Sequence, residues 1–221
     1  MALKGLLTTR QIWVPTLRGW GVISLIGLGL IWGFFRGVHP FLAVNAPVGN
    51  DLLVIEGWLS ARDLKKAIQT FQSRNYKHAV TTGLPLSPDS PFVLFYPGLK
   101  NLAEIAKARL VEAGLSETLI TTVPGPPVAK DRTYAGAVEL RKWLDQKEYK
   151  KVDILSLGAH ARRSWLLYRR ALGESYQVGI IAQTNRSYDP ERWWASSAGV
   201  RTVIGELLAY GYARLLFIPE N

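Results

Sequence analysis

The chain has 221 residues, and 48% of them are hydrophobic, which is enough for one membrane anchor and one globular domain with a sizeable core. It contains no Cys, so disulfide bonds and thiolate metal sites are excluded, and its three scattered His residues argue against a His-rich metal site. The formal net charge of +10 favours anionic partners such as membrane lipid headgroups, phosphates or nucleic acid. Nucleic acid is disfavoured, because the chain has no RNP-like, zinc-finger or leucine-zipper pattern.

An uncharged stretch near the N-terminus predicts a membrane-spanning helix. Residues 19–35 hold 17 uncharged residues. As a helix they would be roughly 25 Å long, short for a hydrocarbon core of ~30 Å. The flanking Arg18 and Arg36 can extend to the headgroups, and Trp20 and Trp32 suit the interfaces. We therefore predict a single retained span. A cleaved signal peptide and a buried core helix are alternatives that the sequence leaves open.

The distribution of positive charge predicts the orientation of this span. Lys4, Arg10 and Arg18 precede it, whereas after Arg36 no Lys or Arg occurs until Arg62. By the positive-inside rule the N-terminus is cytoplasmic and the domain that follows is extracytoplasmic, on a bacterial-type inner membrane or a thylakoid-like membrane. The predicted organisation is a cytoplasmic N-terminus (1–18), a transmembrane helix (19–38), a linker (39–50) in which Pro40, Pro47 and Gly49 break any continuing helix, and an extracytoplasmic domain (51–221).

In the domain, short β-branched runs alternate with amphipathic stretches. The expected strands are 51–57, 78–83, 119–123, 152–158 and 176–183, and the expected helices are 61–76, 101–114, 131–148, 160–173 and a final one within 191–217. Strands separated by helices of this length predict a doubly wound α/β fold, a mainly parallel, Rossmann-like sheet covered on both faces. Asp131 is expected to cap the helix that it precedes.

One proline-rich segment does not fit this alternation. Residues 84–98 contain four Pro, which predict an irregular segment, yet residues 92–96 read FVLFY and are apolar. The segment could be a lid over a site, a flap on a membrane or partner, or a loop packed on the domain.

Candidate functional residues fall where parallel sheets bind their ligands, beyond the carboxyl ends of the strands. Glu56 ends the first strand, Thr82 and Gly83 the second, Thr133 opens the third helix of the domain, and Ser156 to Arg163 follow the fourth strand. An Arg and the backbone N–H groups of a helix N-terminus suit a phosphate or carboxylate. His160 would act as general acid or base with Glu56 as its carboxylate partner. Alternatively, His160 caps the turn and the Arg residues face water or lipid headgroups.

The motif SLGAHARR at residues 156–163 resembles the Thr-Ser-x-x-His-x-x-Arg stretch of the SanA/ElyC/YdcF-like envelope proteins, a Rossmann-like family labelled a domain of unknown function. The resemblance covers roughly residues 51–183. It places Ser156, His160 and Arg163 on the Thr, His and Arg of that stretch. It also matches Arg62, Thr82-Gly83 and Thr133 to the Arg, second Gly stretch and Thr of the family. The chain departs from the family at Glu56, where the family has Gly, and at Ala135 and Gly136, where the family has polar residues.

Together these features predict a single-pass membrane protein whose domain binds a small anionic ligand, phosphate- or nucleotide-like, in cell-envelope biogenesis or maintenance. The ligand would be bound by Arg62, Thr82, Gly83, Thr133, Ser156 and Arg163, and any catalysis would involve His160 and Glu56. A catalytic member would be a hydrolase or transferase acting on a phosphorylated or glycosyl substrate. The alternative is a non-catalytic accessory subunit of a larger membrane protein complex. The sequence identifies no cofactor, since it has no dinucleotide fingerprint, Walker loop or nucleophile elbow.

Overall fold

The computed structural model describes residues 12–219, and the chain divides into two compact units, Met1–Gly37 and Val38–Asn221. Residues 1–11 of the predicted cytoplasmic segment, with Lys4 and Arg10, lie outside the described residues. Helix α1 (Leu17–Leu42) provides most of the described part of the first unit. Its length and apolar composition are sufficient to cross a membrane, and a signal sequence would pass the same test.

The predicted break at Pro40 is wrong, because α1 continues through it to Leu42. A proline in the last turn removes only one backbone hydrogen bond, whereas burial of Val38 and Leu42 stabilises that turn. His39 Nε2 also lies 3.1 Å from the hydroxyl of Tyr188. The last turn of the helix therefore belongs to the globular unit rather than to a linker.

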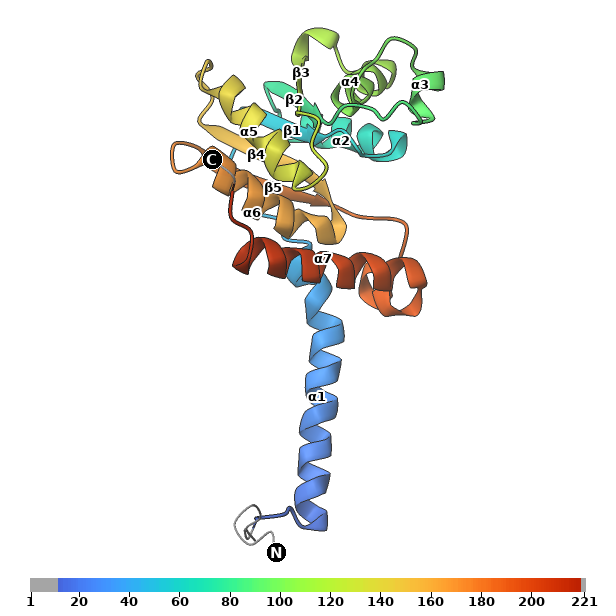
Figure 1. Cartoon of the computed structure of the whole chain (residues 1–221), viewed down its shortest axis with the longest axis vertical. Coiled ribbons are helices and arrows are strands. Elements are labelled where there is room, and N and C mark those ends of the chain that lie inside the picture. Colours follow the sequence, from blue (N-terminus) through green and yellow to red (C-terminus); the bar gives the residue numbers. More distant parts are fainter. Residues whose placement is uncertain (1–11, 220–221) are drawn as a thin grey trace, which may run out of the picture. The chain divides into compact units, whose positions relative to one another are not determined.

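The globular unit contains a five-stranded, all-parallel sheet with the order β3-β2-β1-β4-β5, as Figure 1 shows. The strands are β1 (Leu52–Glu56), β2 (His78–Gly83), β3 (Ile120–Pro124), β4 (Lys151–Leu157) and β5 (Gln177–Gln183). This confirms the predicted doubly wound α/β fold. The central strand β1 is buried along its whole length, which is why the four residues before Glu56 are all apolar rather than alternating.

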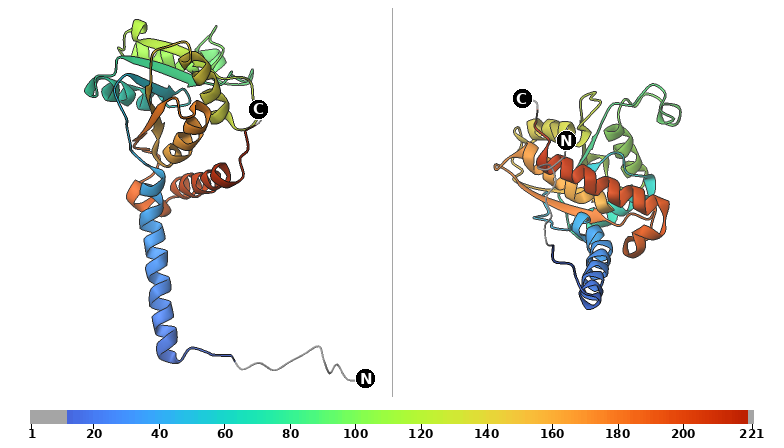
Figure 2. Two further views of the ribbon diagram at one scale, coloured as in Figure 1. Left: turned by 90° about the vertical axis from the view of Figure 1, so that its left-hand side faces the viewer. Right: turned by 60° about the horizontal axis from the view of Figure 1, so that its bottom comes forward.

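Helices cover both faces of the sheet (Figures 1 and 2). On one face α2 (Ala61–Ser73) and α4 (Leu102–Glu112) pack against Leu53 and Ile55. On the other face α5 (Arg132–Leu144) and α6 (Ala161–Leu172) pack against Leu52 and Val54. Successive residues of β1 thus contribute to two separate cores, as the two-residue period of a strand requires.

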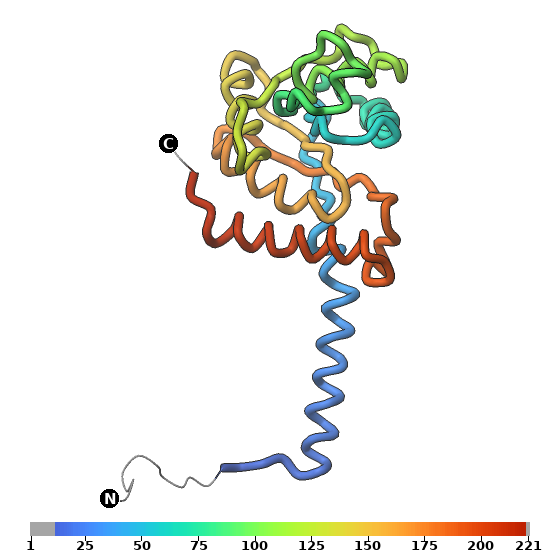
Figure 3. Tube along the Cα trace, turned by 45° about the vertical axis from the view of Figure 1, so that its right-hand side comes forward, coloured from blue at the N-terminus to red at the C-terminus, as the bar shows by residue number. Residues whose placement is uncertain are grey.

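The remaining elements include a further long helix that packs on α6. This helix, α7 (Ser197–Leu215), follows a 3₁₀ segment, η3 (Pro190–Ala195), and runs beside α6 in Figure 3. Two shorter 3₁₀ turns are η1 (Glu117–Leu119) and η2 (Gly158–His160). The proline-rich segment 84–98 is not wholly irregular, because Phe92–Phe95 form one helical turn, α3, immediately after Pro91.

The end of the predicted linker is pinned to the sheet by a buried carboxylate. Asp153 on β4 is 1% exposed and accepts hydrogen bonds from the backbone N–H of Val48 (2.7 Å) and of Gly49 (3.2 Å). It also accepts one from the hydroxyl of Tyr76 at 2.6 Å. Burial and then this contact with Asp153 raise the pKa of Tyr76 well above its usual value. The three donors satisfy the carboxylate and fold residues 46–49 onto the domain.

Candidate functional site

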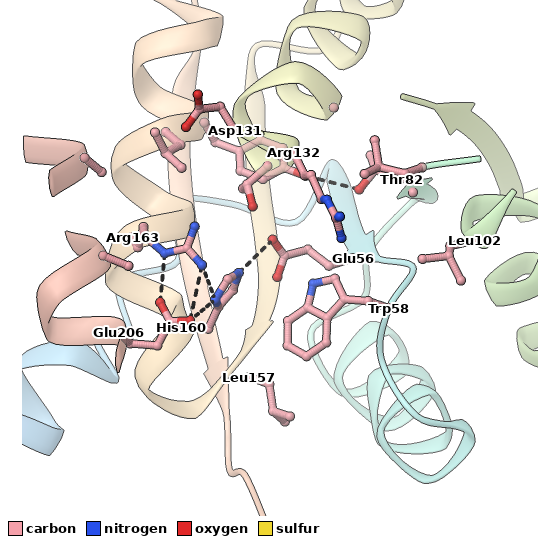
Figure 4. Close-up of a pocket in the computed structure, with 18 of the residues that line it drawn as sticks. Glu56, Trp58, Thr82, Leu102, Asp131, Arg132, Leu157, His160, Arg163 and Glu206 are labelled. Carbon is pink, nitrogen blue, oxygen red and sulfur yellow. Dashed lines mark hydrogen bonds and ion pairs between the residues drawn. The ribbon is translucent and has the colours of Figure 1, made fainter. Parts of the chain in front are cut away.

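A cavity of about 640 Å³ opens at the carboxyl ends of the strands. The strand order changes direction between β1 and β4, and ligands in open parallel sheets bind at such a switch point. Strand ends, the N-termini of α5 and α6, and α7 contribute its lining, which includes Glu56, Trp58, Thr82, Gly83, Asp131, Arg132, Thr133, His160, Arg163, Tyr168, Glu206 and Tyr212. Figure 4 shows how these elements converge on the cavity.

Glu56, the last residue of β1, is a buried carboxylate that accepts hydrogen bonds from two serines. The hydroxyl of Ser156 on β4 donates to Glu56 Oε2 at 2.6 Å, and that of Ser164 on α6 donates to Oε1 at 2.9 Å. Both serines are fully buried, and Ser156 does not line the cavity. Ser156 is therefore a positioning residue for Glu56, rather than the ligand-binding residue that the sequence predicts.

His160 is held so that one ring nitrogen faces Glu56. Its Nδ1 lies 2.8 Å from Glu206 Oε1. Nδ1 also lies 3.0 Å from Nη2 of Arg163. The carboxylate can accept only from a protonated Nδ1, whereas the guanidinium can only donate to an unprotonated one, so the two neighbours favour different tautomers. Nε2 is buried, has no hydrogen-bond partner among the described residues, and lies 3.9 Å from Glu56 Oε1. The ring of Trp58 contacts the imidazole edge-on at 5.1 Å (Figure 4).

Glu206 also neutralises Arg163. The Nε of Arg163 donates to Glu206 Oε2 at 2.8 Å, and Nη2 lies 3.2 Å from Oε1. Burial of Glu206 by itself raises the pKa of its carboxyl, but the hydrogen bonds from His160 and Arg163 outweigh this effect and lower the pKa to about 2. Arg163 is thus paired within the protein, although it lines the cavity, and its binding of an anionic ligand stays a prediction. Arg163 contacts both Glu206 and, through Nη2 at 3.0 Å, Nδ1 of His160.

Arg132 is the cation of the cavity that has no partner in the protein. It opens α5, lines the cavity, and makes no ion pair or hydrogen bond with any of residues 12–219. In Figure 4 its side chain extends from α5 toward Glu56 and Trp58. The predicted cap at Asp131 is wrong. That residue is left-handed, with φ of 52°, and its side chain makes no cap hydrogen bond. The first turn of α5 therefore keeps unsatisfied N–H groups beside Arg132 and Thr133.

The other predicted ligand residues have different positions. Thr82 lines the cavity, and its hydroxyl lies 3.1 Å from that of Tyr168, whose pKa is raised by burial and, secondarily, by the charge of Glu56. Gly83 also lines the cavity, but a Cβ there would lie 2.6 Å from the backbone N of Ala103. Close packing of α4 on β2 therefore explains this glycine. Arg62 is exposed on α2 and does not line the cavity, because the first turn of α2 projects it into solvent.

Glu206 was not among the sequence candidates, although it organises the site. It is the only acidic residue between Arg192 and Pro219, in a stretch otherwise apolar, small or basic. A single carboxylate in an otherwise apolar helix needs a polar partner when it is buried, so its isolation in the sequence could have marked Glu206 as a site residue. What the sequence does not contain is the position of α7 relative to α6, which brings residues 43 to 46 positions apart into contact.

In comparisons with known proteins, no family model and no curated protein matches this chain. The chemistry of the site is therefore the basis for a functional proposal. A carboxylate that orients the imidazole, an unpaired Nε2, a buried carboxylate beside it and a free guanidinium are suited to binding an anionic group and transferring a proton to or from it.

Proposed function

We propose that this is a single-pass membrane protein whose extracytoplasmic α/β domain binds a small anionic ligand, phosphate- or nucleotide-like, in cell-envelope biogenesis or maintenance. The observation that carries the proposal is the unpaired guanidinium of Arg132 in the cavity, beside the uncapped N-terminus of α5. A planar cation and free backbone N–H groups together form a binding site for phosphate or carboxylate oxygens.

The membrane part of the proposal is supported by the composition of α1 and by charge. Of the large apolar side chains of α1, most are exposed within the chain, for example Leu25 at 71% and Leu30 at 70%. Such a surface is stable in lipid and unfavourable in water. The positive charges that precede α1 favour a cytoplasmic N-terminus. The resemblance of residues 156–163 to the SanA/ElyC/YdcF-like family supports a role in the envelope.

Proton transfer is the chemistry that the polar groups support. In the tautomer whose Nδ1–H donates to Glu206, the imidazole of His160 can accept a proton at Nε2 from a water molecule or a ligand hydroxyl, and Glu56 can then stabilise the imidazolium. A hydrolase or transferase acting on a phosphorylated or glycosyl substrate would use these groups. The role of Arg132 would be to hold the anionic part of that substrate.

Thermal unfolding of the full-length protein in detergent tests the anion site. The panel comprises inorganic phosphate, nucleotides, sugar phosphates and polyprenyl phosphates. A compound at ~100 times its dissociation constant should stabilise the wild type by about 2.7 kcal/mol. Arg132→Ala should lose this stabilisation. Arg62→Ala, which removes an exposed Arg outside the cavity, is the matched control and should keep it. An equal effect of the ligand on wild type and Arg132→Ala would contradict the proposal.

A second function, as a non-catalytic accessory subunit of a larger membrane complex, is favoured by one observation. In the one-turn helix α3, Leu94 and Phe95 are 83% and 74% exposed, which is costly for a surface that nothing covers. We expect a subunit to co-purify with its complex at fixed stoichiometry in mild detergent, and Leu94→Ser with Phe95→Ser to release it. A monodisperse, uncomplexed wild type would argue against this second function.

A further inference from the structure

Helix α7 has an apolar row on the face opposite the cavity. Val200, Ile204, Leu208 and Leu215 recur at helical spacing on this outer face, and Leu208 and Leu215 are 69% and 81% exposed. The chain continues with exposed Leu216 and Ile218. The outer face of a helix on a soluble domain is normally polar. This row will be called the outer face of α7.

The exposed charges on α7 are of one sign. The only acidic residue of α7 is Glu206, which points into the cavity and is neutralised there. Arg201 and Arg214 are exposed on α7, one toward each end of the apolar row. On the neighbouring helix α6, Arg170 donates hydrogen bonds to the carbonyl oxygens of Ala213 and Arg214. An apolar row flanked by Arg residues complements an anionic lipid surface.

The outer face lies on the same helix that receives the end of α1. Within the globular unit the ring of Phe41 contacts that of Tyr210 on α7 at 5.6 Å, and the guanidinium of Arg162 lies 4.0 Å from the centroid of the Phe41 ring. The first compact unit ends at Gly37, and Phe41, which meets α7, follows it by only a few residues.

We propose that α7 is an interfacial helix, whose outer face rests on the surface of an anionic bilayer. Val200, Ile204, Leu208 and Leu215 would enter the boundary between headgroups and acyl chains, and Arg201 and Arg214 would bind lipid phosphates. This inference rests on the proposed membrane anchor. It adds a second attachment, which would hold one wall of the cavity, through Glu206 and Tyr212, at the membrane surface.

Site-directed spin labelling of the full-length protein in vesicles tests this proposal directly. The chain contains no Cys, so single labels at Leu208→Cys and Leu215→Cys need no background removal. Gln69→Cys, exposed on α2, is the matched control. Each label is measured in phosphatidylcholine vesicles with and without phosphatidylglycerol, by collision with oxygen, which concentrates in lipid, and with a water-soluble nickel chelate.

We expect the labels at 208 and 215 to collide about tenfold less with the nickel chelate than the control does, and more with oxygen. This difference should grow with phosphatidylglycerol and shrink when Arg201→Glu and Arg214→Glu are combined. Labels at 208 and 215 as accessible to nickel as the control would overturn the proposal. Labels shielded from both reagents would overturn it as well, since a protein partner or a second copy would then cover the face. Failure of the anchor is distinguishable, because the protein would then not float with the vesicles.

Discussion

Replacing Gly179 with Ala should strongly destabilise the domain. A Cβ at this position of β5 would lie 1.9 Å from Asp153 Oδ1, 2.7 Å from the backbone N of Val48 and 2.9 Å from the carbonyl oxygen of Ala46. To accommodate it, either the strand or the pinned segment 46–49 must move, and the hydrogen bonds to the buried carboxylate are then lost. We expect the free energy of unfolding to fall by about 3–5 kcal/mol, a large part of the stability of a typical domain.

Urea unfolding of the detergent-solubilised protein, followed by tryptophan fluorescence, measures this effect. Gly205→Ala on α7 is the matched control, because a Cβ there meets nothing within 4 Å. That control should be neutral or stabilise the protein by up to about 1 kcal/mol, since Ala favours a helix over Gly. If Gly179→Ala unfolds at the same urea concentration as the wild type, residues 46–49 are not part of the folded domain.

Glu206→Gln should change how stability depends on pH. In the folded protein the pKa of Glu206 is lowered from 4.5 to about 2. The unfolded chain therefore takes up the proton first as the pH falls, so this carboxylate stabilises the fold above pH 4.5 and ceases to do so near pH 2. The shift corresponds to about 3 kcal/mol of stability at neutral pH. The variant should be less stable than the wild type by about this amount at pH 7, and the two should converge toward pH 2.

The measurement is a series of urea titrations between pH 7 and pH 2. Glu139→Gln provides the control, because Glu139 forms only a surface ion pair with Lys142, at 2.8 Å, and such pairs contribute little. The difference between wild type and Glu139→Gln should stay small throughout. A constant difference between wild type and Glu206→Gln over the whole range would show that the contacts with His160 and Arg163 do not stabilise the ionised carboxylate.

These two experiments test two carboxylates, Asp153 and Glu206, each of which connects distant segments of the chain. The contacts of Asp153 fold the end of the predicted linker onto the sheet. The contacts of Glu206 fix α7 over the N-terminus of α6 and orient His160. One wall of the cavity is therefore linked to the rest of the site by an acidic residue late in the chain, which pairs with a His and an Arg that precede it by 46 and 43 positions.

The parts of the fold that could be predicted are those that depend on interactions between residues close in sequence. The strands were identifiable because a strand buried on both faces needs a continuous apolar run, such as LLVI at residues 52–55. The helices α2 and α6 were identifiable because their buried residues recur at helical spacing, for example Leu64, Ala67, Ile68 and Phe71 on α2. Local rules failed at two positions. Pro40 lies within α1 because burial of the last turn outweighs the lost hydrogen bond, and Asp131 adopts a left-handed conformation instead of capping α5, for which the structure gives no long-range contact among residues 12–219.

The sequence by itself determined the α/β class, a segment apolar enough to span a membrane, and the location of Glu56, Thr82, Thr133 and His160 at the carboxyl end of the sheet. These properties depend on hydrophobic periodicity and on the alternation of strands with helices, which are both local features of the sequence. The tertiary structure decided which charges are available. Arg163 is neutralised by Glu206, Arg62 faces solvent, and Arg132 is left free in the cavity. Ion pairs form between residues that are distant in sequence, so only the packing of α5, α6 and α7 could distinguish these three arginines.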